Sequence, residues 1–389
     1  MKTILLFFLF TYSLSFAQII QGTVVDDKEH QLNNVTIYLD GTKTATVSKE
    51  DGTFILPLST QSSGNIIFQK EDYQTFSTEV SAVVNKNLKV VLTKTNTIEE
   101  IVLVPYTSEA YTNYINIFLR NFIGDDPGNV RIKNLKTLKF SYDKKKKLLR
   151  VKAPKTLLIE NKNLGYEIEY NLMNYSTDFN TNITNYSGTS FFKETKNTDK
   201  VKINRLNAYD GSLLHFFRSI YSNTISENGF IVNQVVKVPN SNYPTEEELN
   251  TLTDFMALSR SSETINIPEN IRDISRRKSS QKSHILAITK TLIPDSDYVK
   301  RANRQVILGF KNILQVNYIK VPYEDIRKNQ FTKGKYNRNL SSFLYSEEEK
   351  SFEVSKEGNI STPDQLITQG DFSKNKIENM LPLDYQLGD

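Results

Sequence analysis

Short apolar runs separated by polar turn residues dominate the first part of the chain. Segments rich in Val, Ile, Thr and Phe are bounded by Gly, Asp, Asn, Lys or Ser, and no helical period competes with them. This spacing predicts an all-β sandwich. The predicted strands are Ile20 to Asp26, Leu32 to Leu39, Thr44 to Val47, Phe54 to Leu56, Gly64 to Phe68 and Leu88 to Leu92.

Asp-Gly pairs mark the turns between these strands. Asp40-Gly41 and Asp51-Gly52 accept positive φ at low cost, so we expect both pairs to shape the backbone. In the strand before the first pair, Val35, Ile37 and Leu39 alternate with polar neighbours, and Tyr38 should be half exposed. A calcium loop built from Asp26, Asp27 and Asp51 is the functional alternative, but the spaced acidic ladder of an EF-hand is missing.

Several motifs occur in the order found in a known family. They are Gly22-Thr-Val-Val-Asp26, Leu32-Asn-Asn-Val35, Ile37-Tyr-Leu39 with Gly41-Thr42, and Asp51-Gly-Thr-Phe54. Residues 18 to 93 therefore resemble the carboxypeptidase regulatory-like domain of Bacteroidota. The resemblance implies a seven-stranded Ig-like or prealbumin-like (transthyretin-like) sandwich, and a noncatalytic module found before many partners, including TonB-dependent receptors and peptidases. Asn33 replaces the usual proline.

The remainder of the chain mixes helical and strand patterns. Ser108 can cap a helix that runs to Phe122 and ends before Gly124. Strand runs follow, and Asp143 to Lys147 looks like a hairpin tip whose four lysines are solvated, with anionic lipid or glycan as the alternative ligand. A mixed α+β domain with an antiparallel sheet is the expected fold. Arg205 to Tyr221 should form a helix, with Gly211 as its weak point.

Three residues in that helix invite a catalytic interpretation. Asp210, Ser212 and His215 lie close in sequence, but a triad is defined by directed hydrogen bonds, and no Gly-x-Ser-x-Gly elbow surrounds Ser212. We therefore prefer a histidine that packs within helices. The acidic runs Glu246 to Glu248 and Glu347 to Glu349 could be proposed as glycosidase acids, but such clusters normally lie at helix starts or solvated turns.

The histidine spacing argues against a zinc carboxypeptidase, which needs His-x-x-Glu and a distant His. The residues three positions after His30, His215 and His284 are Asn33, Arg218 and Ala287. The chain has no cysteine, which also excludes thiolate ligands and cysteine nucleophiles. We assign no catalytic, cofactor-binding or metal-binding residue and expect no cofactor.

Composition and the N-terminus indicate export. The apolar run Ile4 to Phe10 after Lys2, followed by Ser15-Phe-Ala17, is typical of a cleaved signal peptide and too short for a spanning helix. Lys and Arg exceed Asp and Glu by 49 − 44 = +5 over 389 residues, which gives little reason to propose nucleic acid. We expect no transmembrane span in the mature chain, and a location in the periplasm, at the outer membrane or on the cell surface.

Segments nearer the C-terminus add three expectations. Residues 240–283, rich in Ser, Asn and Glu, suggest a flexible insertion, with Ser275 to Ser283 mobile and its basic residues a less favoured polyanion site. Ser373 to Met380 should be a short helix that stops before Pro382. Segments such as Asn161 to Tyr166 and Gly370 to Ser373 resemble the body of exported proteins that carry the regulatory-like domain, for which no functional residues are carried over.

These expectations combine into a multidomain organisation. It consists of a signal peptide (1–17), the regulatory-like sandwich (18–95), a linker (96–107) and an α+β body of unknown function (108–389). We predict a non-enzymatic exported protein that binds an envelope protein or glycan or supports the envelope. The alternatives are a hydrolase or carboxypeptidase-associated protein, or an accessory to TonB-dependent uptake in which a partner recruits the linker strand 97–105. The oligomeric state stays open.

Overall fold

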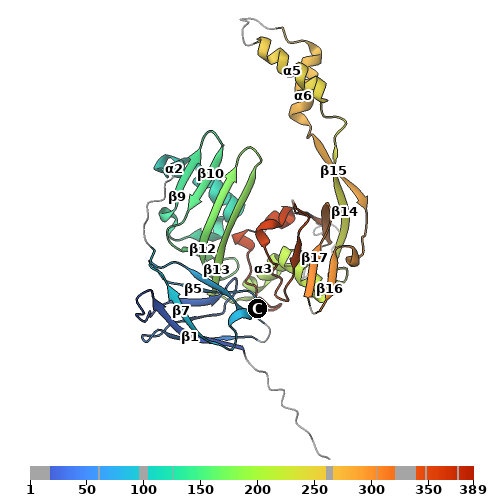
Figure 1. The fold of residues 1–389 in the computed structure, drawn as a ribbon. Helices are drawn as coiled ribbons and strands as arrows, with labels where there is room; N and C mark the ends of the chain where they lie inside the picture. Colours follow the sequence, from blue (N-terminus) through green and yellow to red (C-terminus); the bar gives the residue numbers. More distant parts are fainter. Residues whose placement is uncertain are drawn as a thin grey trace, which may run out of the picture. The chain divides into compact units, whose positions relative to one another are not determined.

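The chain folds into two compact units (Figure 1). The structure is a computed structural model, and it describes residues 18–59, 62–95, 104–125, 127–259, 266–303, 305–319, 339–346, 348–374 and 376–389. Unit 1 contains the described residues up to Leu214 together with 355–359 and those of 375–389, and unit 2 contains 215–354 and 360–374. The predicted signal peptide and residues 96–103 of the predicted linker lie outside the described residues.

The N-terminal part of unit 1 is built from two small sheets around one core. The strand order is β4-β1-β7 in one sheet and β3-β2-β5-β6 in the other. Alternating side chains from both sheets, such as Ile37, Phe54 and Phe68, are fully or almost fully buried between them. The elements are β1 (Gln18–Asp26), β2 (Thr36–Leu39), β3 (Ala45–Val47), β4 (Thr53–Leu58), β5 (Asn65–Gln69), β6 (Phe76–Glu79), α1 (Val80–Val83) and β7 (Asn87–Leu92).

This β-rich arrangement agrees with the strand predictions, whereas the finer assignment to a prealbumin-like sandwich stays a prediction. Gly41 and Gly52 both have positive φ, as the turn chemistry indicates. Asp51 accepts hydrogen bonds from the backbone N–H and hydroxyl of Thr53, which lower the pKa of its carboxyl. The pattern missed β6, because its side chains are mostly polar and exposed.

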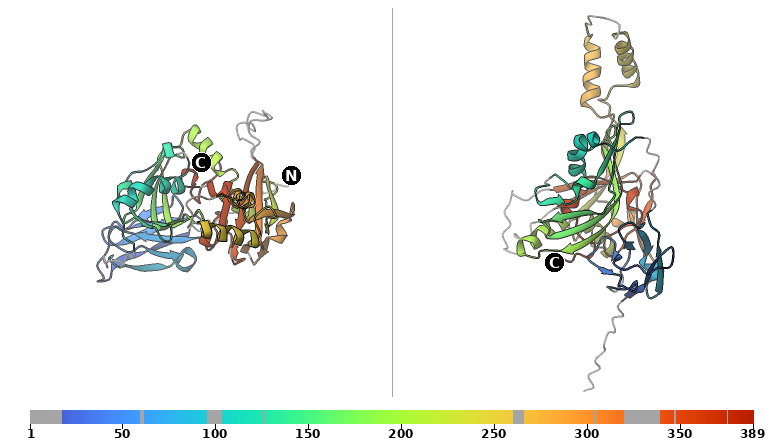
Figure 2. Two further views of the ribbon diagram at one scale, coloured as in Figure 1. Left: turned by 90° about the horizontal axis from the view of Figure 1, so that it is seen from above. Right: turned by 90° about the vertical axis from the view of Figure 1, so that its left-hand side faces the viewer.

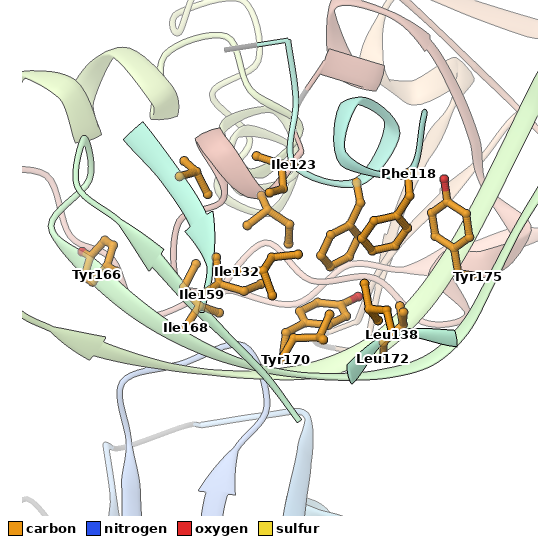
Figure 3. Close-up of a cluster of buried hydrophobic side chains, with 14 of the residues drawn as sticks. Phe118, Ile123, Ile132, Leu138, Ile159, Tyr166, Ile168, Tyr170, Leu172 and Tyr175 are labelled. Carbon is orange, nitrogen blue, oxygen red and sulfur yellow. The ribbon is translucent and has the colours of Figure 1, made fainter. Parts of the chain in front are cut away.

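The second layer of unit 1 is a curved antiparallel sheet with helix α2 against one face (Figure 3). β11 and β10 pair with successive parts of β12, and β13 pairs along its whole length. Phe118 and Phe122 of α2 are fully buried against Tyr175 and Tyr170 of the sheet. The elements are α2 (Ser108–Phe122), β8 (Val130–Ile132), β9 (Lys139–Asp143), β10 (Leu148–Lys152), β11 (Leu157–Asn161), β12 (Tyr166–Asp178) and β13 (Ile183–Glu194), with 3₁₀ turns η1 (Pro127–Asn129) and η2 (Leu135–Thr137).

Two edges of this sheet are covered by other parts of the same unit. At β9, the N–H of Thr107 donates to Phe140 O at 2.9 Å, and Ser141 Oγ donates to Val104 O at 2.8 Å. At β13, the turn after β2 takes the place of a further strand. Some backbone groups at both edges therefore have partners, which reduces the tendency of open edges to pair with other chains.

The contact at β13 is formed by the Asp40-Gly41 turn. The N–H of Gly41 donates to Ser190 O at 2.7 Å, and the N–H of Ser190 donates to Asp40 Oδ1 at 2.8 Å. The N–H of Phe192 donates to Thr42 O at 3.0 Å. Asp40 thus does more than shape its own turn: burial raises the pKa of its carboxyl to about 6, although the hydrogen bond from Ser190 partly offsets this.

The expectation that Tyr38 is half exposed is wrong. Its ring is buried, its hydroxyl bonds Thr189 Oγ1 at 2.9 Å, and its ring centroid lies 5.8 Å from that of Phe191. Alternation within β2 shows that Tyr38 points away from the sandwich core. It does not show that β13 packs against that outer face.

A buried arginine joins helix α3 (Asp199–Tyr209) to the same sheet. The Arg205 side chain has no exposed surface, and its guanidinium lies 4.1 Å from the centroid of the Tyr166 ring. It donates to Leu164 O, Lys196 O and Glu194 Oε2, each at 2.8 Å. One planar guanidinium thus binds acceptors on both segments, and it holds the loop before β12 next to the chain at the end of β13.

Unit 2 contains a five-stranded antiparallel sheet, β15-β14-β18-β19-β21, and a three-stranded sheet, β16-β17-β20. Its aromatic core includes Phe216, Phe230 and Tyr318, with ring centroids 4.8 to 5.1 Å apart in contacting pairs. The elements are α4 (Leu213–Ser222), β14 (Phe230–Pro239), α5 (Glu246–Ser259), α6 (Glu269–Ser280), β15 (His284–Lys290), η3 (Asp295–Asp297), β16 (Val299–Ala302), β17 (Gln305–Gly309), β18 (Ile313–Ile319), β19 (Asn339–Tyr345), β20 (Ser351–Glu353), η4 (Pro363–Gln365), β21 (Ile367–Gly370) and η5 (Asp371–Lys374).

Two helix predictions are corrected. The expected helix from Arg205 to Tyr221 is two helices, α3 and α4, because Gly211 adopts positive φ between them. Most of Ser275 to Ser283 lies in helix α6, in which Arg277 forms salt bridges with Asp273 and with Glu248 of α5, and the expected mobility of this segment stays a prediction. The helix expected over Ser373 to Met380 is replaced by 3₁₀ turns, η5 and η6 (Ile377–Asn379).

We predict that Arg205→Ala destabilises unit 1 by about 3 kcal/mol or more, because it strips buried carbonyls and Glu194 of their donor. Arg150→Ala removes an exposed arginine from β10 and should change stability by no more than about 0.5 kcal/mol. Urea unfolding of both variants measures the difference. Equal losses would contradict a structural role for the buried guanidinium.

We also predict that Asp40→Asn stabilises the protein at neutral pH. The pKa of Asp40 is about 6 in the folded protein, compared with 3.8 for an ordinary Asp, so the folded state binds the proton more tightly than the unfolded state. Ionisation of Asp40 therefore lowers the free energy of unfolding; this loss is absent below about pH 4 and complete above pH 6. The gain should therefore reach at most about 3 kcal/mol near pH 7.5 and disappear near pH 4. Thermal unfolding across that range measures it.

Asp51→Asn is the matched control for Asp40→Asn. The pKa of Asp51 is lowered, so its ionised form stabilises the fold above its ordinary pKa, and its amide variant should be the less stable one at neutral pH. A loss of stability for Asp40→Asn at neutral pH would show that the hydrogen bond from Ser190 outweighs the burial of the charge.

Candidate interaction surface

The residues singled out as candidate chemistry occupy separate environments. His30 is exposed and its Nδ1 lies 3.0 Å from Asp26 Oδ2 in a turn, whereas His284 is exposed on β15. Although burial raises it, hydrogen bonds from His30 and Lys28 hold the pKa of Asp26 below its usual value. Among the residues that the structure describes, no group of three or more His, Cys, Asp or Glu side chains is placed to hold a metal ion.

His215 lies in the aromatic core of unit 2. Its ring is 5.0 Å from that of Phe230 and 5.6 Å from that of Tyr318, both at steep angles. Burial, helped by the charge of Arg218, lowers the pKa of His215 to about 4, so the ring is neutral at neutral pH. Ser212 lies in the turn before α4, where its N–H donates to Tyr209 O. A packing role explains this environment of His215, and the absence of catalytic residues stays a prediction.

The remaining charged candidates are surface features. Glu246 to Glu248 form the first turn of α5, where Glu248 accepts from the N–H of Thr245 as in a capping box. Glu347 lies outside the described residues. The lysines of the hairpin tip follow Asp143, whose carboxylate accepts from the N–H groups of Lys145 and Lys146. No helix in the described part of the chain is both long and apolar enough to cross a membrane.

The strongest candidate for an interaction is a two-stranded ribbon in unit 2, which sequence reasoning missed. We define the ribbon as residues 234–239 of β14 and 284–290 of β15. β18 pairs with β14 only as far as Val235, so the ribbon continues beyond the sheet with β15 as its single neighbour. In Figures 1 and 2, β14 and β15 run from the sheet into the helical hairpin formed by α5 and α6.

Apolar side chains cover both faces of the ribbon. Paired residues lie on one face, so Val238 with Ile285 and Val236 with Ala287 form an apolar strip. The opposite face carries Leu286 and Ile288.

Much of this apolar surface is exposed. Ile285, Leu286 and Ile288 retain 49%, 44% and 52% of their accessible surface. Exposed apolar residues on both faces of one strand are a feature of surfaces that bind a partner.

The outer edge of β15 is open. Within the described part of the chain, β15 pairs with β14 alone, and all but one of its residues are exposed. By contrast, the edges of β9 and β13 in unit 1 have partners. The β-branched runs Phe230 to Val238 and His284 to Thr289 are the sequence signal that could have identified this hairpin, but the intervening polar residues suggested an insertion.

The helical hairpin beyond the ribbon is held by its own contacts. Leu252 of α5 and Ile271 and Ile274 of α6 form a small buried cluster, which salt bridges of Arg277 with Glu248 and Asp273 reinforce. The hairpin is therefore held by contacts of its own, and the residues of β15 remain largely exposed within the described part of the chain.

We predict that Ile288→Ala changes the free energy of unfolding by less than about 1 kcal/mol, because half of the side chain is already in water. Leu314→Ala in the covered part of the same sheet should cost about 2 to 5 kcal/mol, since Leu314 is 1% exposed. Chemical denaturation of both variants tests this. A comparable loss for Ile288→Ala would mean that the ribbon is packed in solution and is not a free surface.

Comparison with known proteins identifies one region. Residues 20–103 match the family model described as CarboxypepD_reg-like domain, which confirms the resemblance of the N-terminal region to that domain. The match ends well before the middle of the chain, so it does not assign the remaining residues to a family. No curated protein matches the chain.

Proposed function

We propose that the protein is a non-enzymatic, exported binding protein of the cell envelope that holds its partner on the ribbon of unit 2. The single observation that carries this proposal is the ribbon itself, in which an open strand edge lies between two exposed apolar faces. Burying such surface against a partner is favourable, whereas leaving it in water favours aggregation. The N-terminal domain supports the proposal, because the resemblance implies a noncatalytic module.

Unit 1 has a supporting role in this proposal. Its edges at β9 and β13 are partly covered, and its buried arginine donates to acceptors within the same unit, so unit 1 is tied together by its own hydrogen bonds. Binding residues in proteins are commonly positioned by an ordered scaffold.

We predict that the double variant Ile285→Ser/Ile288→Ser loses its partner while the fold is retained. The tagged full chain, incubated with solubilised native envelopes, should retain a specific component that the double variant fails to retain. Met173→Ser/Ile183→Ser is the matched control, because it removes two exposed apolar side chains from β12 and β13 and should bind normally.

A parallel assay for peptide and ester cleavage addresses the hydrolase alternative. Turnover by the purified chain, combined with equal retention of envelope components by both double variants, would overturn the proposal.

A further inference from the structure

We propose that the edge of β15 accepts an extended, acidic and apolar segment of a partner protein, which adds to the sheet as a further strand. This inference rests on the proposed binding function and specifies the chemistry of the partner. It is carried by three properties of the ribbon: its open backbone edge, its apolar faces and its charge.

The backbone requires an occupant that can form hydrogen bonds. A strand that lacks a neighbour leaves alternate N–H and C=O groups along its outer edge to be satisfied by water or by another chain. A lipid surface offers apolar contact but no matching ladder, and open sheet edges are not tolerated in hydrocarbon. The edge of β15 therefore favours a polypeptide in extended conformation over a membrane.

The positive charge of the ribbon favours a polypeptide that carries negative charge. Lys237 and Lys290 lie within the ribbon and Lys282 lies two residues before it, whereas residues 234–239 and 282–290 contain no carboxylate. All three lysines are exposed, and none forms a salt bridge with a described residue. A partner strand with carboxylates near these ammonium groups would gain from complementary charge.

The same charge disfavours a second copy of the chain. An antiparallel pair of β15 strands centred on Ala287 would match apolar residues, but it would place Lys290 of each copy near the Lys282 end of the other without a compensating acid from the ribbon. The adjacent helical hairpin does not supply that acid from Glu248 or Asp273, because both are paired with Arg277. Glu246 and Glu247 are exposed in the first turn of α5, beyond the ribbon.

The apolar faces define the side-chain pattern of the partner. Added strand residues alternate between the two faces, and both faces of β15 present aliphatic side chains next to the edge: Ile285 on one, Leu286 and Ile288 on the other. A segment that combines β-branched residues with Asp or Glu meets both the packing and the charge requirement.

The experiment uses the full chain and labelled peptides of the length of β15 that alternate Glu and Val. Fluorescence anisotropy should detect binding that weakens as salt rises. The corresponding peptide of Lys and Val should bind at least about tenfold more weakly, and so should the Glu and Val peptide methylated at every backbone nitrogen. The first comparison tests charge, and the second tests the hydrogen-bond ladder.

A charge-reversed protein gives the matched control. Lys237→Glu/Lys282→Glu/Lys290→Glu leaves the aliphatic residues and the edge in place and should reverse the preference, so that the Lys and Val peptide binds best. Circular dichroism confirms that the variant is folded, and because all three side chains are exposed, little loss of stability is expected.

Several outcomes would overturn the inference. Equal binding of all peptides would indicate nonspecific apolar contact, and binding to phosphatidylglycerol vesicles without peptide binding would indicate a membrane. Self-association in sedimentation that Ile285→Ser/Ile288→Ser abolishes would indicate a second copy, and failure of every peptide to bind would exclude an acidic strand. If peptides fail but envelope capture still depends on Ile285 and Ile288, the proposed binding function stands and only its strand chemistry is wrong.

Discussion

Each strand at the border of a β-sheet has backbone donors and acceptors on one side that need partners, and this requirement organises the protein. In unit 1 it is met internally at two borders: residues 104–107 contact β9, and the Asp40-Gly41 turn covers part of β13. In unit 2 the described residues leave β15 paired on one side only. What distinguishes β15 is that its border lies between exposed apolar faces, and this is the surface that we propose for binding.

The contact between the Asp40-Gly41 turn and β13 has an electrostatic cost, because it places carboxylates in a buried environment. Asp40 gives Ser190 an acceptor, but its carboxylate is placed where burial raises its pKa. The C-terminal segment shares this region, because the N–H of Leu383 donates to Gly41 O and Asp384 accepts from the N–H of Lys43. Burial raises the pKa of Asp384 as well. Two carboxylates therefore hold backbone groups together at an electrostatic cost, which makes the junction sensitive to pH.

Local patterns predicted much of the first domain, because its strands are short apolar runs bounded by polar turn residues, and strands such as β4 alternate between a core face and an outer face. Gly41 and Gly52 mark turns that any chain of this pattern would need. The limits appear where a residue's role depends on distant parts of the chain. Alternation within β2 predicts that Tyr38 is half exposed. It is buried because β13, which lies far along the sequence, packs against it. The burial of Arg205 depends on carbonyls before β12 and after β13, which no local period reveals.

The ribbon was missed for a different reason. Its two strands are separated by residues whose composition resembles a flexible insertion, although α5 and α6 fold there as a pair. The apolar positions of β15 are also exposed, so they do not follow the alternation of buried and exposed residues by which half-buried strands are recognised. If the ribbon binds a partner as we propose, its apolar positions would be covered only in the complex and need not follow the pattern of an isolated fold.

Residue-resolved amide hydrogen exchange of the isolated full chain tests the central claim most directly. The account predicts that the amides of Ser190 and Phe192, which have acceptors at the covered border of β13, exchange slowly. Alternate amides along 284–290, which point away from β14, should exchange as freely as solvent-exposed groups. Uniform slow exchange through β15 would mean that its border is already occupied, and it would contradict the account.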